Sequence, residues 1–253
     1  MSFLNLIRKI IFLEKISYIT SKKHILNQSW QDISFMHWKV DKNLLSKNIP
    51  KGLILDLYED EAYVGVIPFM MKNVRPRWAM SIPFVSNFPE FNIRTYVKAG
   101  KTKGVFFLTL DAQSIITRIY ATGVYHLPYR YSRGYVNRNS KTFQWKSSRL
   151  WSDYSLEGYC ESEGESGYAE KGSLEEFLLE RYFLFVADRN HKIRKGFIHH
   201  NRWRFKKAKA KIVKNSFLES FSLGVKNVFS PDFCHASDGV EVKAWALEYL
   251  DKD

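Results

Sequence analysis

The stretch FPEFNIRTYVKAGKTKGVFFLTL, residues 88–110, carries the two clearest strand patterns in the chain. Its first part, FNIRTYV, alternates apolar and polar side chains, as a strand with two different faces does. Its second part, GVFFLTL, is nearly all apolar, which is typical of a strand buried on both sides. Because only residues 98–103, with Gly100, separate the two parts, we predict neighbouring central strands joined by a short turn.

The rest of the chain adds more short strands and a few short helices. Strand patterns are ILDLY (54–58), AYVGVIPF (62–69), 124–129, 131–137, 141–147, YFLFVA (182–187), KGFIHH (195–200), AKAKIVK (208–214) and VEVKAWAL (240–247). Helix patterns follow Asp41, follow Asp111 through Ile119, open with Ser173 and Glu176 of a capping box, and recur near Leu218. Residues 153–180 otherwise predict a loop-rich connection.

This order of elements predicts the fold class. We expect an α+β protein of mostly antiparallel β structure, folded as a barrel or curled sheet with a few short helices. We expect residues 1–253 to form a single domain. Alternating βαβ units and a glycine-rich phosphate loop are both missing from the pattern, so dinucleotide binding is not predicted.

The first 24 residues read as an amphipathic helical extension. Leu4, Ile7 and Ile11 recur at helical spacing, but charged residues interrupt the apolar stretch, so it fits neither a secretory signal nor a bilayer span. We expect the extension to pack on its own domain or on a second subunit; binding to a membrane surface is the less favoured alternative. Cys160 and Cys234 fit no metal or disulfide spacing and suggest reduced thiols in a cytoplasmic protein.

Charge is distributed unevenly along the chain, whose formal net charge is +13. Residues 153–180 carry nine acidic side chains against one lysine, whereas residues 187–215 carry eleven basic side chains against one aspartate. The basic segment 201–214, with Trp203 and Phe205 between its cations, fits a surface for nucleic acid or an acidic partner. The alternation of lysine and alanine at 207–211 equally fits a half-exposed strand, which is the favoured interpretation.

Several motifs, taken in order, resemble a known family. They are FMHW (35–38), IPKGLILDLYEDEAYVGVIPFMM (49–71), FPEFNIRTYV (88–97), GVFFLTLDA (104–112), LPY (127–129), FLLERYFLF (177–185), and IHH (198–200) with Trp203. Together they span roughly Trp30 to Leu218 and are similar to the YqjF-like family, a domain of unknown function within the acetoacetate decarboxylase-like superfamily.

The resemblance implies a cone-shaped β-barrel with a central pocket. The decarboxylase carries a pair of lysines just after a proline, whereas this chain has Tyr129 and Arg130 after Pro128. Tyrosine cannot form an imine and arginine stays protonated, so the resemblance argues for a shared pocket without the Schiff-base lysine chemistry. The family's Pro-Pro-Trp-Pro-Leu stretch after His200 is replaced here by Asn-Arg-Trp-Arg-Phe.

Four residues are predicted to bind a ligand: Glu90, Arg94, His37 and Tyr129. Glu90 and Arg94 share one face of the strand predicted in FPEFNIRTYV (88–97), and the resemblance sets Glu90 near the decarboxylase's pocket glutamate. A plain ion pair that fixes the barrel, or a structural histidine at His37, are the alternatives. No catalytic residue is assigned. No metal site and no cofactor are predicted, since adjacent His199 and His200 point to opposite faces of a strand.

We therefore predict an uncharacterised YqjF-like protein whose barrel pocket binds a small organic carboxylate or carbonyl compound. Whether the protein is an enzyme stays open, and so does homo-oligomerisation. The alternative function is an interaction protein that uses its basic surface to bind nucleic acid or an acidic partner.

Overall fold

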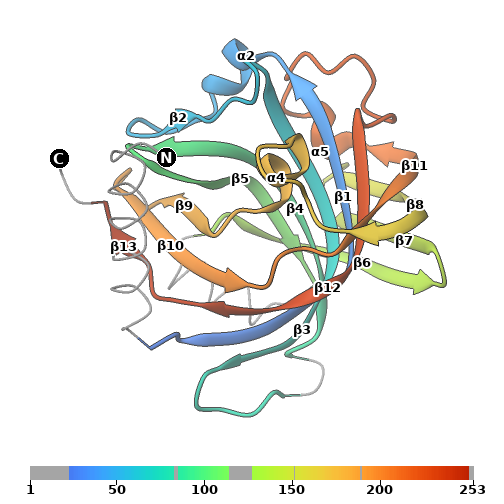
Figure 1. Cartoon of the computed structure of the whole chain (residues 1–253), viewed down its shortest axis with the longest axis horizontal. Coiled ribbons are helices and arrows are strands. Elements are labelled where there is room, and N and C mark those ends of the chain that lie inside the picture. The colour runs from blue at the N-terminus through green and yellow to red at the C-terminus, as the bar shows by residue number, and fades with distance from the viewer. Residues whose placement is uncertain (1–22, 83–84, 114–126, 151, 189, 251–253) are drawn as a thin grey trace.

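The computed structural model describes residues 23–82, 85–113, 127–150, 152–188 and 190–250 (Figure 1). The strands in this part are β1 (Leu26–Val40), β2 (Ile54–Leu55), β3 (Ala62–Pro76), β4 (Phe88–Ala99), β5 (Thr102–Ala112), β6 (Tyr129–Asn139), β7 (Thr142–Arg149), β8 (Ser155–Gly167), β9 (Phe183–Ala187), β10 (Ile193–His200), β11 (Phe205–Asn215), β12 (Phe233–Ala244) and β13 (Glu248–Tyr249). The helices are α2 (Lys42–Ser46), α4 (Leu174–Leu179) and α5 (Ser216–Glu219).

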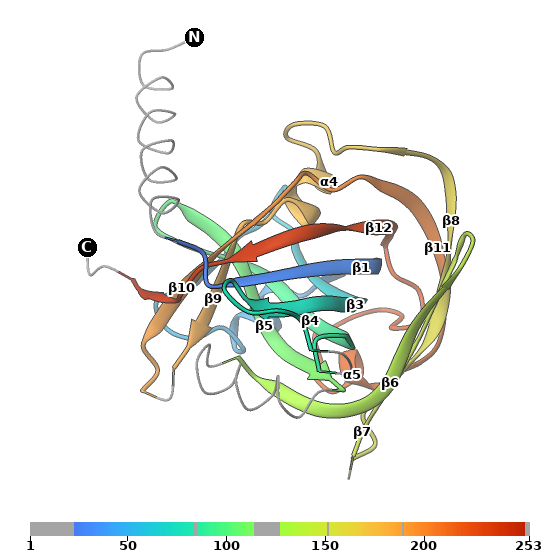
Figure 2. The ribbon, with the colours of Figure 1, turned by 90° about the horizontal axis from the view of Figure 1, so that it is seen from below.

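All of these strands belong to one mixed sheet whose pairings form two rings with a shared wall (Figure 2). The wall is the run β12-β1-β3-β4-β5, in which every neighbouring pair is antiparallel. Strands β9 and β10 join β5 back to β12 and complete what we call the short ring. Strands β6, β7, β8 and β11 also join β5 to β12, and complete the long ring. The predicted fold class, α+β with mostly antiparallel strands, is confirmed.

The wall separates two hydrophobic cores because successive side chains of a strand point to opposite faces. On β3, Tyr63, Ile67 and Phe69 face the core inside the short ring, whereas Val64 and Val66 face the core inside the long ring. The wall strands are therefore buried on both sides, which explains their nearly continuous apolar sequences.

The predicted central hairpin is confirmed. β4 and β5 pair antiparallel from Glu90 with Ala112 to Ala99 with Thr102, with one irregularity after Ile93. Gly100 lies in the connecting turn with φ at +53°, in the left-handed region that glycine enters at little cost.

The short helices at Asp41, Ser173 and Leu218 are also confirmed. The Asp41 carboxylate accepts hydrogen bonds from the backbone of Asn43 and Leu44 and caps α2. At α4, the Ser173 hydroxyl accepts from the Glu176 backbone, while the Glu176 carboxylate accepts from the Gly172 backbone rather than from that of Ser173.

Two sequence-based interpretations are wrong. The acidic residues 155–167 form strand β8 instead of a loop, because β8 pairs with the basic strand β11 and their charges neutralise one another, as in the ion pair between Glu163 and Lys209 at 2.9 Å. Residues 26–40, for which no strand was predicted, form the long wall strand β1, whose mixed polar and apolar sequence conceals its burial.

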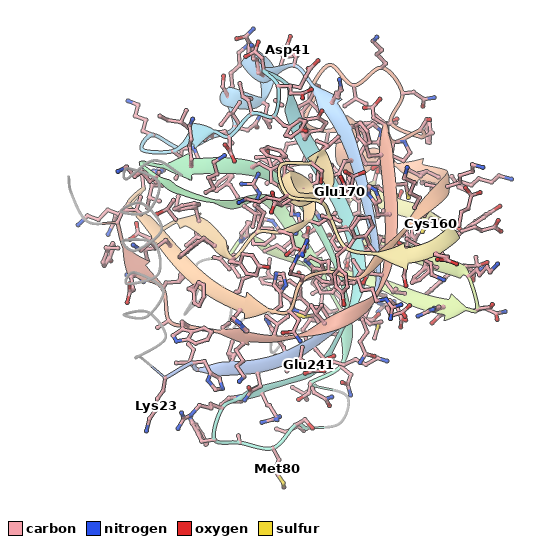
Figure 3. All side chains as sticks on the ribbon, viewed as in Figure 1. Lys23, Asp41, Met80, Cys160, Glu170 and Glu241 are labelled. Atoms are coloured by element: carbon pink, nitrogen blue, oxygen red, sulfur yellow. The ribbon has the colours of Figure 1, made fainter. Side chains whose placement is uncertain are left out.

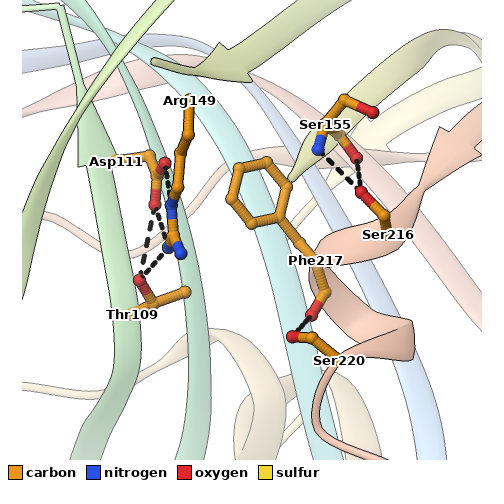
Figure 4. Close-up of polar contacts among 7 residues, drawn as sticks. All are labelled: Thr109, Asp111, Arg149, Ser155, Ser216, Phe217 and Ser220. Carbon is orange, nitrogen blue, oxygen red and sulfur yellow. Dashed lines mark hydrogen bonds and ion pairs between the residues drawn. The ribbon is translucent and has the colours of Figure 1, made fainter. Parts of the chain in front are cut away.

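Asp111 does not act as a helix cap in the structure. It lies within β5, where its carboxylate accepts two hydrogen bonds from Arg149 of β7 at 2.7 Å (Figure 4). The same guanidinium contacts the Thr109 hydroxyl and lies over the rings of Tyr154 and Phe217, so this ion pair joins β5 to β7 beside the core of the long ring. The helix predicted at 115–119 and the strand predicted from 124 to 126 lie outside the described residues.

Residues 1–22 of the predicted N-terminal extension likewise lie outside the described residues; Lys23 and His24 are in no helix. Across the described part of the chain, no helix combines the length and the hydrophobicity of a membrane span.

Candidate functional site

The short ring contains a cavity of about 380 Å³. Its wall is mainly aliphatic and aromatic, with a few polar groups concentrated on β4. Its lining residues include Trp30, Phe69, Met80, Ile82, Glu90, Asn92, Arg94, Leu110, Tyr129, Leu179, Arg181, His200 and Trp203. The lining includes residues of the connection between β3 and β4, as well as Leu179 and Arg181 at and after the end of α4.

Strand β4 supplies the polar wall of the cavity. Glu90, Asn92 and Arg94 alternate along it and all line the cavity, whereas Phe91 and Ile93 between them pack in the core of the long ring. The orientation that the strand period predicts for Glu90 and Arg94 is therefore the one observed. Both side chains are buried, with Glu90 only 4% exposed.

The register of three strands brings Tyr129 to Glu90. Asn92 of β4 pairs with Leu110 of β5, and Leu110 pairs with Tyr129 at the start of β6, so these residues form one row across the sheet. Glu90 lies two residues from Asn92 along β4, which leaves it diagonal to Tyr129. The Tyr129 hydroxyl donates a hydrogen bond of 2.6 Å to Glu90 Oε2.

Burial dominates the acid–base properties of this pair. Loss of hydration raises the pKa of Glu90 from its usual 4.5 to about 7, although the Tyr129 hydroxyl and the Asn92 amide act in the opposite direction. Burial, followed by the charge of Glu90, raises the pKa of Tyr129 well above its usual range. Glu90 is thus able to exchange a proton near neutral pH, while Tyr129 remains a donor.

Three polar atoms of cavity-lining residues have no hydrogen-bond partner among the residues that the structure describes. They are Asn92 Oδ1, Arg94 Nε and Trp30 Nε1, all of them buried. Arg94 is otherwise held in place, because its Nη2 donates to the Leu178 carbonyl at 3.2 Å and its guanidinium lies 5.7 Å from the centre of the Phe35 ring. Unpaired buried polar groups are costly, so the side chains of Trp30, Asn92 and Arg94, which line the cavity, would each be stabilised by a partner of matching polarity.

The structure does not bring His37 to the cavity. His37 faces the short ring from β1, but its Nε2 lies 2.8 Å from the Tyr96 hydroxyl, which in turn donates to the Leu178 carbonyl. Tyr96 thus stands between His37 and the carbonyl that also holds Arg94. Burial lowers the pKa of His37 well below its usual value, with the charge of Arg94 as a smaller cause. The sequence predicts Glu90 and Arg94 in one cavity with His37, Tyr129 or both, and Tyr129 is the one that lines it.

Arg181 also lines the cavity, where it is held in place by an ion pair and by aromatic rings. Its Nη1 donates to the buried Asp56 carboxylate at 2.7 Å, and its guanidinium lies over the rings of Phe177 and Tyr96. Arg181 therefore pairs with Asp56, and not with the neighbouring Glu180. Glu180 instead accepts a hydrogen bond from the Trp203 backbone.

Sequence reasoning missed the aromatic part of the cavity wall. Trp30 and Trp203 stack with ring centres 6.3 Å apart, and His200 lies 5.1 Å from the Trp203 ring. No local pattern marks Trp30, since it comes from the strand that was not predicted. Asn92 is not among the predicted ligand-binding residues, although the strand period places it on the same face as Glu90 and Arg94.

Metal and thiol chemistry have little support in the described residues. They contain no group of three or more His, Cys, Asp or Glu side chains arranged to hold a metal ion. His199 is exposed and His200 is buried, so the two point to opposite faces of β10 as expected. Cys160 and Cys234 are both free thiols and belong to the long ring.

The chain is similar in sequence to proteins of unknown function. The family model DUF2071, described as "Uncharacterized conserved protein", matches residues 27–241. The uncharacterized protein YqjF of Bacillus subtilis (strain 168) is 33% identical over 225 residues, which cover 88% of this chain and 91% of YqjF. The YqjF-like resemblance of the motifs is confirmed.

Solved structures share the fold at low sequence identity. Acetoacetate decarboxylase from Legionella pneumophila superposes with a TM-score of 0.63 and 10% identity, over 90% of this chain and 87% of that one. The enduracididine biosynthesis enzyme MppR, complexed with the condensation product of pyruvate and imidazole 4-carboxaldehyde, superposes with a TM-score of 0.64 and 9% identity. The match covers 91% of this chain and 90% of MppR. An acetoacetate decarboxylase-like enzyme from Sphingomonas wittichii RW1 superposes with a TM-score of 0.62 and 10% identity, over 92% of this chain and 95% of that one. The fold is acetoacetate decarboxylase-like.

Proposed function

We propose that this chain, which belongs to the DUF2071 family of uncharacterised conserved proteins, binds a small organic carboxylate or carbonyl compound in the cavity of the short ring. The single observation that carries the proposal is that Asn92 and Arg94, whose Oδ1 and Nε are unpaired among the described residues, line a mainly apolar cavity. Such a combination of an apolar wall with a few convergent polar groups is typical of small-molecule sites.

The polar groups define the head of the ligand. Arg94 Nε donates, so it selects an acceptor such as a carbonyl or carboxylate oxygen. Asn92 Oδ1 accepts, and it selects a hydroxyl or amide donor. With a pKa of about 7, Glu90 either accepts a hydrogen bond or, when protonated, donates one, and protonation removes its repulsion of an anionic head.

The apolar groups define the body of the ligand. Trp30, Phe69 and Trp203 present ring surfaces to the cavity, and these favour an aliphatic or aromatic body over a sugar-like one. The structural neighbour MppR was solved with a condensation product of pyruvate, a carbonyl compound, which supports the same class of ligand for this fold.

We propose further that the site works without a lysine imine. Where the resemblance to the decarboxylase leads one to expect lysine, Tyr129 donates its hydroxyl to Glu90. The described residues that line the cavity include no lysine. Lys146, which lies on β7, is engaged with Glu157 at 3.1 Å in the long ring.

A binding titration tests the ligand. The probes are a panel of monocarboxylic acids, ketones and 2-oxo acids with alkyl or aryl bodies, followed by protein-observed NMR. We expect saturable shifts for some members, and at least about tenfold weaker binding by Leu110→Phe, which fills the cavity, and by Glu90→Gln. Val213→Ser, at an exposed position of β11, is the control. If no member of the panel binds, or if Leu110→Phe binds as well as the wild type, the proposal is wrong.

Borohydride trapping tests the absence of imine chemistry. The protein is incubated with acetoacetate or pyruvate, reduced, and analysed by mass spectrometry. We expect no mass increase on any lysine. A specific adduct on one lysine, together with loss of turnover when that lysine is replaced, would restore the decarboxylase mechanism.

A further inference from the structure

The connection after β3 exposes an unusual group of large apolar side chains. Trp78, Met80 and Ile82 are 87%, 88% and 61% exposed, and they lie within five residues of one another. The other large apolar side chains exposed in the described part of the chain, such as Ile54, are spread over different elements. Single exposed apolar residues are ordinary, but a concentrated group marks a contact surface. We call residues 77–82 the apolar tip.

The apolar tip forms the mouth of the cavity. Met80 and Ile82 line the cavity as well as facing solvent, so an apolar path runs from the surface of the tip to the interior of the short ring. Figure 3 shows Met80 projecting from one end of the molecule, away from α2 and from the strands of the long ring.

Basic side chains surround the base of the apolar tip. Arg77 is exposed next to Trp78, and Arg75 precedes it on β3. Asn27 of β1 pairs with Arg75 on one side and with Lys243 of β12 on the other, so these two cations lie in one row across the wall. In the described part of the chain, none of these cations forms an ion pair. Glu241, two residues before Lys243, is the exposed acidic side chain nearest along β12.

We propose that the apolar tip docks on an anionic lipid membrane, with Trp78, Met80 and Ile82 in the interfacial region and Arg75, Arg77 and Lys243 at the phosphate level. An exposed tryptophan with aliphatic neighbours and a rim of cations is the combination that favours a charged bilayer interface. A surface that binds another protein usually carries both basic and acidic side chains around its apolar centre. The apolar tip is surrounded mainly by basic side chains, so an anionic membrane fits it better than a protein partner does.

Docking in this orientation turns the cavity mouth toward the bilayer. A ligand with an apolar body would then enter from the lipid phase without crossing water. This last consequence rests on the proposed function of the cavity, whereas the docking itself stands on the exposed side chains alone.

Vesicle co-sedimentation of the full chain tests the proposal. We expect binding to vesicles of phosphatidylcholine with phosphatidylglycerol, and weaker binding to phosphatidylcholine alone. The triple variant Trp78→Ser, Met80→Ser, Ile82→Ser should lose at least about tenfold in partition coefficient. The matched control is Ile54→Ser, Val213→Ser, Phe229→Ser, which removes three other exposed apolar side chains and should bind as the wild type does.

Two further measurements separate the components of the contact. Replacing Arg77 and Lys243 by glutamate should abolish the preference for phosphatidylglycerol. Brominated lipids should quench the fluorescence of the wild type more than that of Trp78→Phe. Unfolding midpoints of all variants establish that they are folded.

Three results would overturn the proposal. One is the absence of vesicle binding by the wild type. Another is binding that persists in the triple variant, which would assign the contact to another segment, such as the apolar N-terminal sequence. The third is a change of oligomeric state in the triple variant with vesicle binding intact, which would make the tip a protein interface.

Discussion

The short ring and the long ring share five wall strands but use their interiors differently. In the long ring, Trp145, Phe143 and Phe217 pack into a continuous core, and the ionisable pair of Asp111 and Arg149 is held by direct hydrogen bonds. In the short ring, the corresponding space is a cavity with ionisable side chains on its wall. One strand therefore supports stability on one face and a site on the other.

Both rings contain buried polar atoms without a described hydrogen-bond partner, but only in the short ring do the residues that carry them line a cavity. Within the described part of the chain, Trp145 Nε1 in the long ring also lacks a hydrogen-bond partner, but it belongs to a packed core and does not line the cavity. Asn92 Oδ1 and Arg94 Nε belong to residues that border open space. The comparison predicts that substitutions in the long ring reduce stability, whereas substitutions on the cavity wall reduce binding.

The largest effect is expected when the ion pair of the long ring is broken. Arg149→Ala leaves the Asp111 carboxylate buried without its partner, and should lower the free energy of unfolding by roughly 3–5 kcal/mol. Urea denaturation measures this loss. Lys42→Ala, which removes an exposed ion pair with Asp60, is the control and should cost less than about 1 kcal/mol. Equal losses in the two variants would contradict the structural role of Arg149.

The next effect concerns Glu90 in the short ring. Its pKa is raised in the folded state, so between pH 4.5 and about 7 the folded protein binds more protons than the unfolded chain. The free energy of unfolding therefore falls as the pH rises through this window. Above about pH 7 the whole loss, up to about 3 kcal/mol, has occurred.

Glu90→Gln should remove this pH dependence. The free energy of unfolding, measured in urea from pH 5 to 8 for both proteins, should favour the variant increasingly toward pH 8. The difference between the two curves isolates Glu90 from the buried histidines, which are common to both. Parallel curves would show that Glu90 titrates like an exposed carboxyl group.

The smallest effect separates open space from packed space. Leu156 in the long ring and Leu110 on the cavity wall are both almost fully buried. Leu156→Phe overfills a packed core and should cost roughly 1–3 kcal/mol, whereas Leu110→Phe extends into the cavity and should cost well under that. Thermal unfolding of both variants decides the matter, and similar losses of stability would mean that the cavity offers no usable room.

Local sequence patterns were sufficient to predict the elements whose own residues alternate, are uniformly apolar or include a helix cap. Residues 91–97 alternate and residues 104–110 are uniformly apolar, so the hairpin of β4 and β5 and the orientation of Glu90 and Arg94 followed from the sequence. Asp41 and Ser173 are local caps, and the structure has both. The resemblance of the ordered motifs supplied the superfamily.

Long-range pairing determined what the sequence did not reveal. The sequence of β8 is typical of an acidic loop, and only its pairing with β11 explains why it forms a strand. The sequence of β1 is partly polar, and its burial follows from its pairing with β12 and β3. The contact between Tyr129 and Glu90 depends on the register of three strands. His37 points into the short ring, as the cavity residues do, but its ring is hydrogen-bonded to the Tyr96 hydroxyl. The spacing of residues in the sequence does not indicate this contact.

The most direct test is a crystal structure of the protein soaked with the strongest ligand of the titration. The account predicts density inside the short ring, with an acceptor oxygen at roughly 3 Å from Arg94 Nε and a polar atom beside Asn92 Oδ1 and Glu90. Density for the ligand on the outer surface only, with the cavity filled by side chains, would contradict it.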